Sequence, residues 1–526
     1  MSGSISVVRV AAIVALGGFL MGFDASVISG VVGFIEPEFA LTKIELGWAV
    51  ASLTLTATLG MMASGPVSDQ IGRRSTLAIA ALIFLVSALA SAVAPNYLVL
   101  VIARMLGGFG VGAALIVAPI YISEMAPPES RGKLVSINQL NIVLGISAAF
   151  FSNWFILQLA QGDAGWATAL GIAGNPWRWM LGVEALPALA YLLALAAVPE
   201  SPRWLVMRGQ HDDATAVLTR LRGAAAAERE MVSIREHIAV ADAETGPQLG
   251  LRALFETPIR LILLIGLTIA IMQQITGINA VFFYAPMIFE QAGVGRDAAF
   301  AQAVLVGLVN IVFTVLAMAL IDRLGRRTLL LIGSTGVCLS LFVLAWGFDA
   351  ATYTLPRAAV DGLGPELAGA LEPLVGRSFD SDLAFREALG GVLAADQLEA
   401  HSGAITAAAI SVSPTLILGG ILGFVASFAI SLGPVMWVLL SEIVPNRLRG
   451  AAVSFLGFVN SAVSFLVQLV FPWELETLGS ATTFLAYGCF GLVGLAILAW
   501  CLPETRGRSL EELEELLVKA PAARGT

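Results

Sequence analysis

Residues 10–35 read Val10-Ala-Ala-Ile-Val-Ala-Leu-Gly-Gly-Phe-Leu-Met-Gly-Phe-Asp24-Ala-Ser-Val-Ile-Ser-Gly-Val-Val-Gly-Phe-Ile35, and Asp24 is the only charged residue among them. About 20 apolar residues, rising about 1.5 Å each, cross the hydrocarbon core of a bilayer, so this stretch predicts a membrane-spanning helix. A carboxylate inside such a helix costs several kcal/mol unless it is protonated or paired. Asp24 therefore either bonds a neighbouring helix or belongs to a functional site, and the second is typical of ionisable residues inside membranes.

The composition extends this interpretation to the whole chain. Of the 526 residues, 58% are hydrophobic and 13% are charged, whereas soluble domains are about a quarter charged. The three cysteines lie in apolar segments and the three histidines lie far apart, which predicts no disulfide framework, no metal site and no cofactor. Much of the net charge of −9 comes from residues 349–403, so we expect no nucleic-acid partner. The chain has no Gly-x-x-x-x-Gly-Lys-Ser/Thr loop, so we expect no direct drive by ATP, and we expect no enzyme and no catalytic residues.

Hydropathy predicts twelve membrane spans, six on each side of a polar segment. Their approximate ranges are 8–33, 46–68, 75–94, 98–121, 133–158, 178–198, 259–290, 298–321, 328–348, 408–440, 450–472 and 480–502. Arginines and lysines gather in alternate loops, so the positive-inside rule places those loops and both termini in the cytoplasm. We therefore expect an all-α, multi-pass protein of a plasma membrane or bacterial inner membrane, surrounded by lipid and monomeric.

The predicted organisation has two six-helix bundles, at residues 1–199 and 259–502, joined by a cytoplasmic helical linker at 200–258 and followed by a cytoplasmic tail at 503–526. The two bundles repeat each other, because Gly-Arg-Arg follows span two at 72–74 and span eight at 325–327. Asp69 and Glu124 are 55 residues apart, but the corresponding Asp322 and Glu442 are 120 apart. The excess predicts an extracellular insertion at about 349–405, with helical segments such as 382–398, and a spacer is favoured over a binding module there.

Arg104 is the obvious partner for Asp24, because it is the only charged residue between Arg74 and Glu124. Counting from the outer ends of their spans places the two side chains at the same depth, about 10 to 13 Å below the surface. An ion pair at low dielectric would make protonation of Asp24 a switch that frees the arginine.

Uncharged amides gather in several other spans. Gln139 lies in span five, Asn310 in span eight and Asn460 in span eleven, while Gln273, Gln274 and Asn279 lie in span seven. Amides donate and accept hydrogen bonds in fixed directions, which suits the hydroxyls of a neutral polyol. Any one of them could instead only bridge two helices, and their convergence at mid-depth is what favours a binding site.

Helix-breaking residues interrupt span ten at Ser431-Leu-Gly-Pro434, just before Trp437. A broken helix can bend to open or close a cavity. Trp437 could stack on the apolar face of a sugar, or it could be an interfacial tryptophan near the cytoplasmic surface.

Charged residues of opposite sign also recur at corresponding cytoplasmic helix ends. Across the two halves they could latch the inner side shut, whereas simple topology anchors would explain the arginines but not the repeated Glu-to-Arg spacing of seven residues. The set comprises Asp69, Arg73, Arg74, Glu124, Arg131, Asp322, Arg326, Arg327, Glu442 and Arg449.

Six motifs in order resemble the sugar porter family of the major facilitator superfamily. They are Gly22 to Gly30, Asp69 to Arg74, Arg131 to Gln139, Pro199 to Trp204, Gln273 to Asn279 and Pro503 to Arg508, and the resemblance covers nearly the whole chain except 349–405. It implies alternating access by rocking of the two bundles, with the sugar between them. Carried over by position, the amides and Trp437 match the family's sugar ligands, Asp24 and Arg104 match the coupling pair of its proton symporters, and Glu124, Arg131, Glu442 and Arg449 match its cytoplasmic gate.

Two residues depart from the family pattern. Phe283 stands where a tyrosine is usual, and Ser461 stands where glucose and xylose carriers usually have tryptophan. The smaller Ser461 enlarges the pocket and leaves fructose or an inositol-type polyol open as substrates. We expect a proton-coupled symporter of a neutral monosaccharide or polyol. The alternatives are a facilitative uniporter, in which Asp24 and Arg104 form a structural pair, and a non-transporting sugar sensor.

Overall fold

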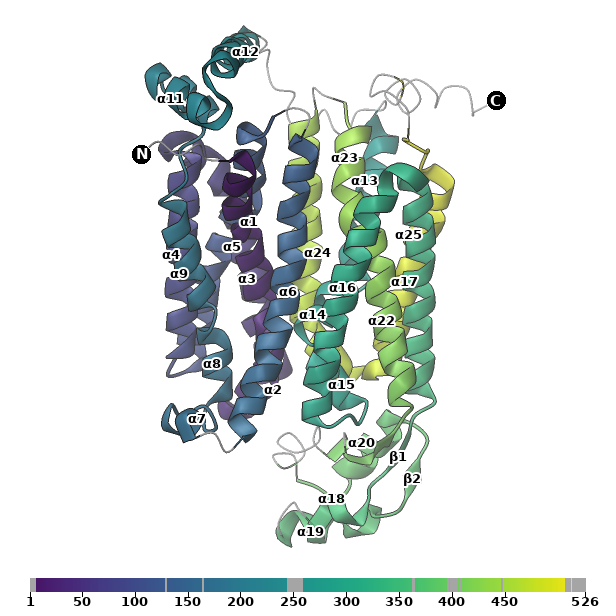
Figure 1. The fold of residues 1–526 in the computed structure, drawn as a ribbon. Helices are drawn as coiled ribbons and strands as arrows, with labels where there is room; N and C mark the ends of the chain where they lie inside the picture. The colour runs from purple at the N-terminus through teal and green to yellow at the C-terminus, as the bar shows by residue number, and fades with distance from the viewer. Residues whose placement is uncertain are drawn as a thin grey trace, which may run out of the picture.

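In the computed structural model the chain forms two helical bundles that stand side by side, with short helices at one end and a small folded segment at the other (Figure 1). The structure describes residues 6–127, 130–162, 165–243, 259–361, 365–394, 397, 405–406, 408–445, 448–506 and 512. Among these residues, 12 helices are long and apolar enough to cross a membrane, and they coincide with the predicted spans. The predicted fold class is therefore confirmed.

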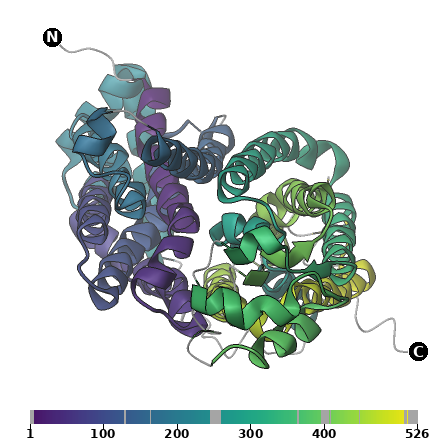
Figure 2. The ribbon, with the colours of Figure 1, turned by 90° about the horizontal axis from the view of Figure 1, so that it is seen from below.

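Seen along the helix axes, the helices form two distinct groups, one for each bundle (Figure 2). The N-terminal bundle contains α1 (Val7–Val27), η1 (Ile28–Gly30), α2 (Val32–Glu38), α3 (Lys43–Ile71), α4 (Arg73–Ala92), α5 (Tyr97–Met125), α6 (Arg131–Gln161), α7 (Gly165–Ala169), α8 (Pro176–Gly182) and α9 (Ala185–Leu195). The C-terminal bundle contains α13 (Arg260–Ile275), α14 (Ile278–Phe283), α15 (Ala285–Gln291), α16 (Arg296–Leu324), α17 (Arg326–Asp349), α22 (Pro414–Ile430), α23 (Leu432–Ile443), α24 (Arg449–Thr477) and α25 (Gly479–Cys501).

Several spans are broken rather than continuous. The interruption predicted in span ten is present, and it lies at Ser431, between α22 and α23. The sequence did not predict the breaks in span seven, where α13 ends before Gly277 and α14 ends before Tyr284. Gly277 has φ +87°, a left-handed conformation that favours glycine, and a Cβ at this position would lie 2.5 Å from the ring of Tyr487. Gly277 therefore allows the chain to change direction between α13 and α14, where it packs against Tyr487.

The predicted short helices between the bundles are α10 (Pro202–Met207), α11 (His211–Arg222) and α12 (Ala224–Ala243). They form a small core of their own, with Leu205, Ala214 and Met231 among its buried residues. The rest of the linker, 244–258, and the part of the predicted tail beyond Arg506 lie outside the described residues, apart from Glu512.

The insertion is a folded unit and not only a helical spacer. It contains β1 (Thr352–Thr354), α18 (Arg357–Asp361), α19 (Pro365–Leu371), η4 (Glu372–Leu374), β2 (Ser378–Phe379), α20 (Asp382–Gly390) and β3 (Ile410–Ser411). The strands form an antiparallel sheet in the order β2-β1-β3, which the sequence did not predict. Tyr353 and Phe385 stack in a separate hydrophobic core. The pairing of β1 with β3 ties the start of α22 to the end of α17, and the Arg386 guanidinium donates to the Glu476 carbonyl at the end of α24.

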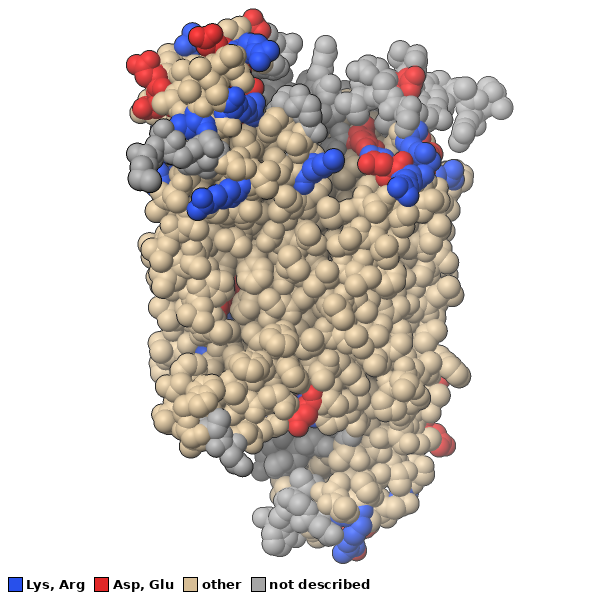
Figure 3. Space-filling model, in the orientation of Figure 1, with Lys and Arg blue, Asp and Glu red and all other residues tan. Residues whose placement is uncertain are grey.

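Charges gather at the end of the bundles that carries Arg73, Arg74, Arg326 and Arg327, which we call the basic end (Figure 3). The bundles touch closely toward the opposite end, where α3 packs on α24 and α6 on α16. Gly47 of α3 lies so close to α24 that a Cβ there would be 1.9 Å from the Leu469 carbonyl oxygen. Gln161 also donates to Asp297 of the other bundle at 2.6 Å. The two bundles are therefore joined at the opposite end.

Candidate functional site

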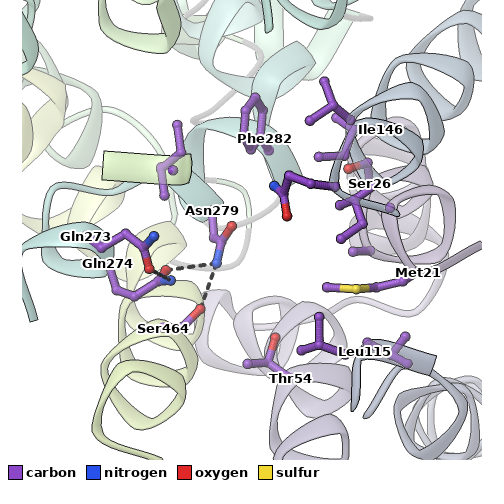
Figure 4. A pocket seen from close by; sticks show the side chains of 18 of the residues that line it. Met21, Ser26, Thr54, Leu115, Ile146, Gln273, Gln274, Asn279, Phe282 and Ser464 are labelled. Atoms are coloured by element: carbon purple, nitrogen blue, oxygen red, sulfur yellow. Dashed lines mark hydrogen bonds between the residues drawn. The ribbon is translucent and has the colours of Figure 1, made fainter. Parts of the chain in front are cut away.

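A cavity of 280 Å³ lies between the two bundles, close to the lower end of the range of about 300 to 1,000 Å³ for small-molecule sites. Its lining is mostly apolar, with polar groups from both bundles (Figure 4). The cavity brings together all the residues predicted to bind sugar, namely Gln139, Gln273, Gln274, Asn279, Asn310, Trp437 and Asn460. Phe283 and Ser461, the two departures from the family pattern, line it as well.

The amides of the C-terminal bundle hold one another in place. Asn460 Nδ2 donates to Gln273 Oε1 at 2.8 Å and to the Ala270 carbonyl at 2.9 Å. Gln274 Nε2 donates to Asn460 Oδ1 at 3.2 Å, and Gln273 Nε2 donates to the Leu432 carbonyl at 2.9 Å. Because Leu432 opens α23, this bond joins the amides to the break in span ten. The network fixes which amide edges remain for a ligand.

Asn279 extends the network toward α24. Its Nδ2 donates to Gln274 Oε1 at 2.9 Å and to Ser464 Oγ at 2.8 Å (Figure 4). Gln468 Nε2 donates to the same Ser464 hydroxyl at 2.8 Å. Ser464 and Gln468 were not among the predicted sugar ligands. The signal was available, because they follow Asn460 by one and two helical turns and therefore share its face of the helix.

Trp437 lies on α23 and its side chain lines the cavity. The residue is 44% exposed, so part of its ring is free of protein contacts. Thr54 and Gln139 contribute polar side chains from the N-terminal bundle, and Figure 4 shows Thr54 at the edge of the cavity near Ser464 of the amide network. Both faces of a ligand in this cavity would thus meet hydrogen-bonding groups.

Asp24 and Arg104 lie next to each other, as their depths predict. Arg104 Nη1 is 3.7 Å from Asp24 Oδ1, and the residues are 2% and 3% exposed, respectively. Arg104 Nε also donates to the Ala49 carbonyl of α3 at 3.1 Å. Asp24 Oδ2 has no hydrogen-bond partner among the described residues. Neither residue is among those that line the cavity, although Ala25 and Ser26 are.

A second buried acid, Glu184, belongs to this cluster. It precedes α9, is 3% exposed and interacts electrostatically with both Asp24 and Arg104. Its Oε1 likewise has no hydrogen-bond partner in the described part of the chain. Glu184 was not predicted as a site residue, although it is a charged residue inside the predicted span 178–198. Two buried carboxyl groups therefore lie near one guanidinium, and of the two only Asp24 is within ion-pair distance of it in the described part of the chain.

At the basic end, the predicted ion pairs form within each bundle. Arg73 contacts Asp69 at 2.8 Å and Glu124 at 3.1 Å. In the C-terminal bundle, Arg326 contacts Asp322 at 3.1 Å and Glu442 at 3.0 Å. Among the side chains described at this end, no ion pair joins the two bundles. The side chains of Arg131 and Arg449 lie outside the described part.

Arg74 and Arg327 bond backbone carbonyls and not carboxylates. Arg74 donates to the carbonyls of Leu195 and Ala196, and Arg327 donates to the Ala499 carbonyl. The Pro-Glu motifs that follow spans six and twelve also have a visible role. Glu200 accepts from the backbone amides of Arg73 and Arg74, and Glu504 accepts from that of Arg326. Each glutamate satisfies unpaired amides at a helix N-terminus, where a negative charge is stabilised.

Comparison with known proteins identifies relatives over the whole length. A family model described as "Sugar (and other) transporter" matches residues 10–360 and 394–517. Between these two ranges, the unmatched residues 361–393 lie within the insertion, as the resemblance predicts. The arabinose-proton symporter of Bacillus subtilis is 34% identical over 98% of this chain and 95% of its own length. The D-xylose-proton symporter of Escherichia coli is 33% identical over 95% of this chain and 94% of its own length.

Solved structures agree with these relatives. The inward-open conformation of the xylose transporter XylE from Escherichia coli matches with a TM-score of 0.72, at 30% identity, over 97% of this chain and 99% of that one. The proton:xylose symporter XylE bound to 6-bromo-6-deoxy-D-glucose matches with a TM-score of 0.68, at 32% identity and the same coverage.

Proposed function

The chain belongs to the sugar transporter family of the major facilitator superfamily, and on that basis we propose that it is a proton-coupled symporter of a neutral monosaccharide or polyol. The observation that carries this proposal is the buried cluster of Asp24, Arg104 and Glu184 beside a cavity lined by both bundles. The relatives named as proton symporters for arabinose and xylose support it.

In this proposal the amides bind the sugar. Gln139 and Asn310 contribute hydrogen-bonding groups from opposite bundles, while Gln273, Gln274, Asn279 and Asn460 form the interlocked set. Trp437 offers an aromatic face to the C–H groups of a sugar ring. No charged side chain is among the lining residues, so a charged substrate would be left without a counterion. Ser461 is among the lining residues, and its small side chain favours substrates larger than a pentose.

Asp24 is the proposed proton carrier, and Arg104 sets its charge state. With both acids ionised, the cluster holds one excess negative charge in an apolar setting, and this favours binding of a proton. Protonation of Asp24 weakens its attraction to Arg104, whose remaining bond to the Ala49 carbonyl belongs to α3. The relative preference of α1, α3 and α5 for the two conformations then changes with the proton.

We place the basic end on the cytoplasmic side, together with the start of α1 and the end of α25, which lie at that end in Figure 1. Hydrogen bonds and close packing join the bundles at the opposite, outer end. The structure would then face inward, in accord with its similarity to an inward-open relative. The arginine–carboxylate clusters of the two bundles are the proposed cytoplasmic gate, and their exchange of partners across the bundles would accompany outward opening.

The proposal is tested by movement of protons with sugar. Purified protein in liposomes without a voltage is given a panel of xylose, arabinose, glucose, fructose and an inositol, each at an inward gradient, and the external pH is recorded. Symport predicts that the transported sugar makes the medium more alkaline as protons enter with it. Sugar entry with no pH change would instead establish a facilitator, and binding with no entry of any sugar would establish a sensor.

A further inference from the structure

Helix α3 contacts both the ion-pair cluster and the sugar-binding bundle. Its Ala49 carbonyl accepts from Arg104 Nε at 3.1 Å. Five residues later, Thr54 Oγ1 donates to Gln468 Oε1 of α24 at 2.9 Å. This second bond crosses from one bundle to the other. A displacement of α3 that follows a change at Arg104 would therefore move the hydroxyl that bonds Gln468.

Gln468 leads from this crossing to the sugar ligands. Its Nε2 donates to Ser464 Oγ, and the same hydroxyl accepts from Asn279 Nδ2, each at 2.8 Å. Thr54 and Ser464 line the cavity, but Gln468 does not and is fully buried. Both ends of its amide are thus engaged, and its orientation is fixed by one group in each bundle. Loss of either partner would leave a buried polar atom unsatisfied.

The bond between Thr54 and Gln468 lies in the region where α3 and α24 of the two bundles pack closely. Gly47, two turns earlier on α3, packs on the Leu469 carbonyl, and Trp48 meets Phe465 edge to face at 5.8 Å. Opening of this end requires α3 and α24 to separate. The bond can therefore form only when this end is closed.

We propose that Thr54 and Gln468 are positioning residues that couple the protonation state of the Asp24–Arg104 cluster to the sugar-binding amides. The route runs from Arg104 through the Ala49 carbonyl and α3 to Thr54, and from Gln468 through Ser464 to Asn279. A protonated cluster and an occupied amide network then stabilise the same outer-closed arrangement. This inference rests on the proposed proton symport, and a measurement of the coupling between proton and sugar tests it.

The test uses substitutions that remove the bond with little change in volume. Thr54→Val removes the donor of this bond, Gln468→Met removes its acceptor, and the double variant removes both. Thr54→Ser keeps the hydroxyl and therefore the bond. Thr58→Val is the matched control, because Thr58 lies one turn further along α3 and its hydroxyl bonds only the Thr54 carbonyl within the helix. For each full-length variant, the dissociation constant of radiolabelled xylose, or of the panel sugar bound most tightly by the wild type, is measured at about pH 6 and about pH 8.

The dissociation constant at the higher pH divided by that at the lower pH measures the coupling between proton and sugar binding. Loss of one hydrogen bond should reduce this ratio by about threefold to tenfold in either single variant. The double variant should lose no more than either single, and Thr54→Ser and Thr58→Val should retain the wild-type ratio. Counterflow exchange of sugar should persist in Gln468→Met and Thr58→Val, because neither residue is among those that line the cavity.

Three results would overturn the inference. If Thr54→Val and Gln468→Met weaken binding by the same factor at both pH values, the bond is only structural. If the losses of the two single variants add in the double variant, the residues do not act through one bond. If the wild type itself shows no pH dependence and no proton movement, the proposed symport fails, and the inference fails with it.

Discussion

Replacement of Asp24 by asparagine separates coupling from transport. The substitution keeps the shape of the side chain but removes the charge that lies 3.7 Å from Arg104 Nη1. Removal of one partner from a tightly bonded buried pair costs about 3 to 5 kcal/mol. The 3.7 Å separation is longer than a hydrogen bond, and the negative charge of Glu184 still acts on Arg104 in the variant. We therefore expect Asp24→Asn to cost about 1 to 3 kcal/mol of stability and to leave a folded protein.

Asp24→Asn should abolish accumulation of sugar even though the variant stays folded. One proton moving through 100 mV supplies about 2.3 kcal/mol, which permits roughly 40-fold accumulation. Without a titratable carboxyl at residue 24, accumulation in liposomes should fall to the equilibrium ratio, while counterflow exchange at equal pH should stay within about threefold of the wild type. Equal loss of accumulation and exchange in a folded variant would refute the assignment of Asp24 as the coupling residue.

Three further predictions concern the binding network, the bundle contact and the insertion. Asn460→Leu leaves buried polar atoms of the amide network unpaired, so sugar binding should weaken about tenfold to a hundredfold; an affinity within twofold of the wild type would contradict the network. Gly47→Ala places a Cβ 1.9 Å from a backbone carbonyl of α24 and should slow transport and lower the melting temperature. Gly33→Ala is the control and should change neither, because no atom lies within 4 Å of its Cβ. Equal effects of the two substitutions would refute a critical contact at Gly47. Replacement of residues 357–408 by a short Gly-Ser linker should leave counterflow exchange intact, because that segment has its own core, and loss of exchange by a folded variant would give the insertion a role in transport.

The membrane architecture followed from the sequence because long apolar helices and repeated Gly-Arg-Arg motifs are local signals. The pairing of Asp24 with Arg104 also followed, since helical rise converts sequence distance into depth. The amides that line the cavity were predicted for a similar reason, because they lie at comparable depths in different spans. Each of these conclusions depends on one residue or one spacing.

The details that were missed depend on contacts between distant segments. The break at Gly277 reflects a left-handed backbone beside the ring of Tyr487, which no pattern in span seven reveals. The three strands of the insertion are only two or three residues long and gain their order from pairing across the segment. Glu184 is different, because the rule that selected Asp24 applies equally to it. Likewise, helical spacing from Asn460 could have identified Gln468.

The central claim is that proton movement drives sugar uphill, and accumulation under a proton gradient tests it most directly. Liposomes containing the wild-type protein receive radiolabelled sugar from the panel at equal concentration on both sides, with and without an inward proton gradient. A gradient of one pH unit supplies about 1.4 kcal/mol, so the account predicts up to about tenfold accumulation that a protonophore abolishes. A transported sugar that stays at equal concentration on both sides under the gradient would contradict it.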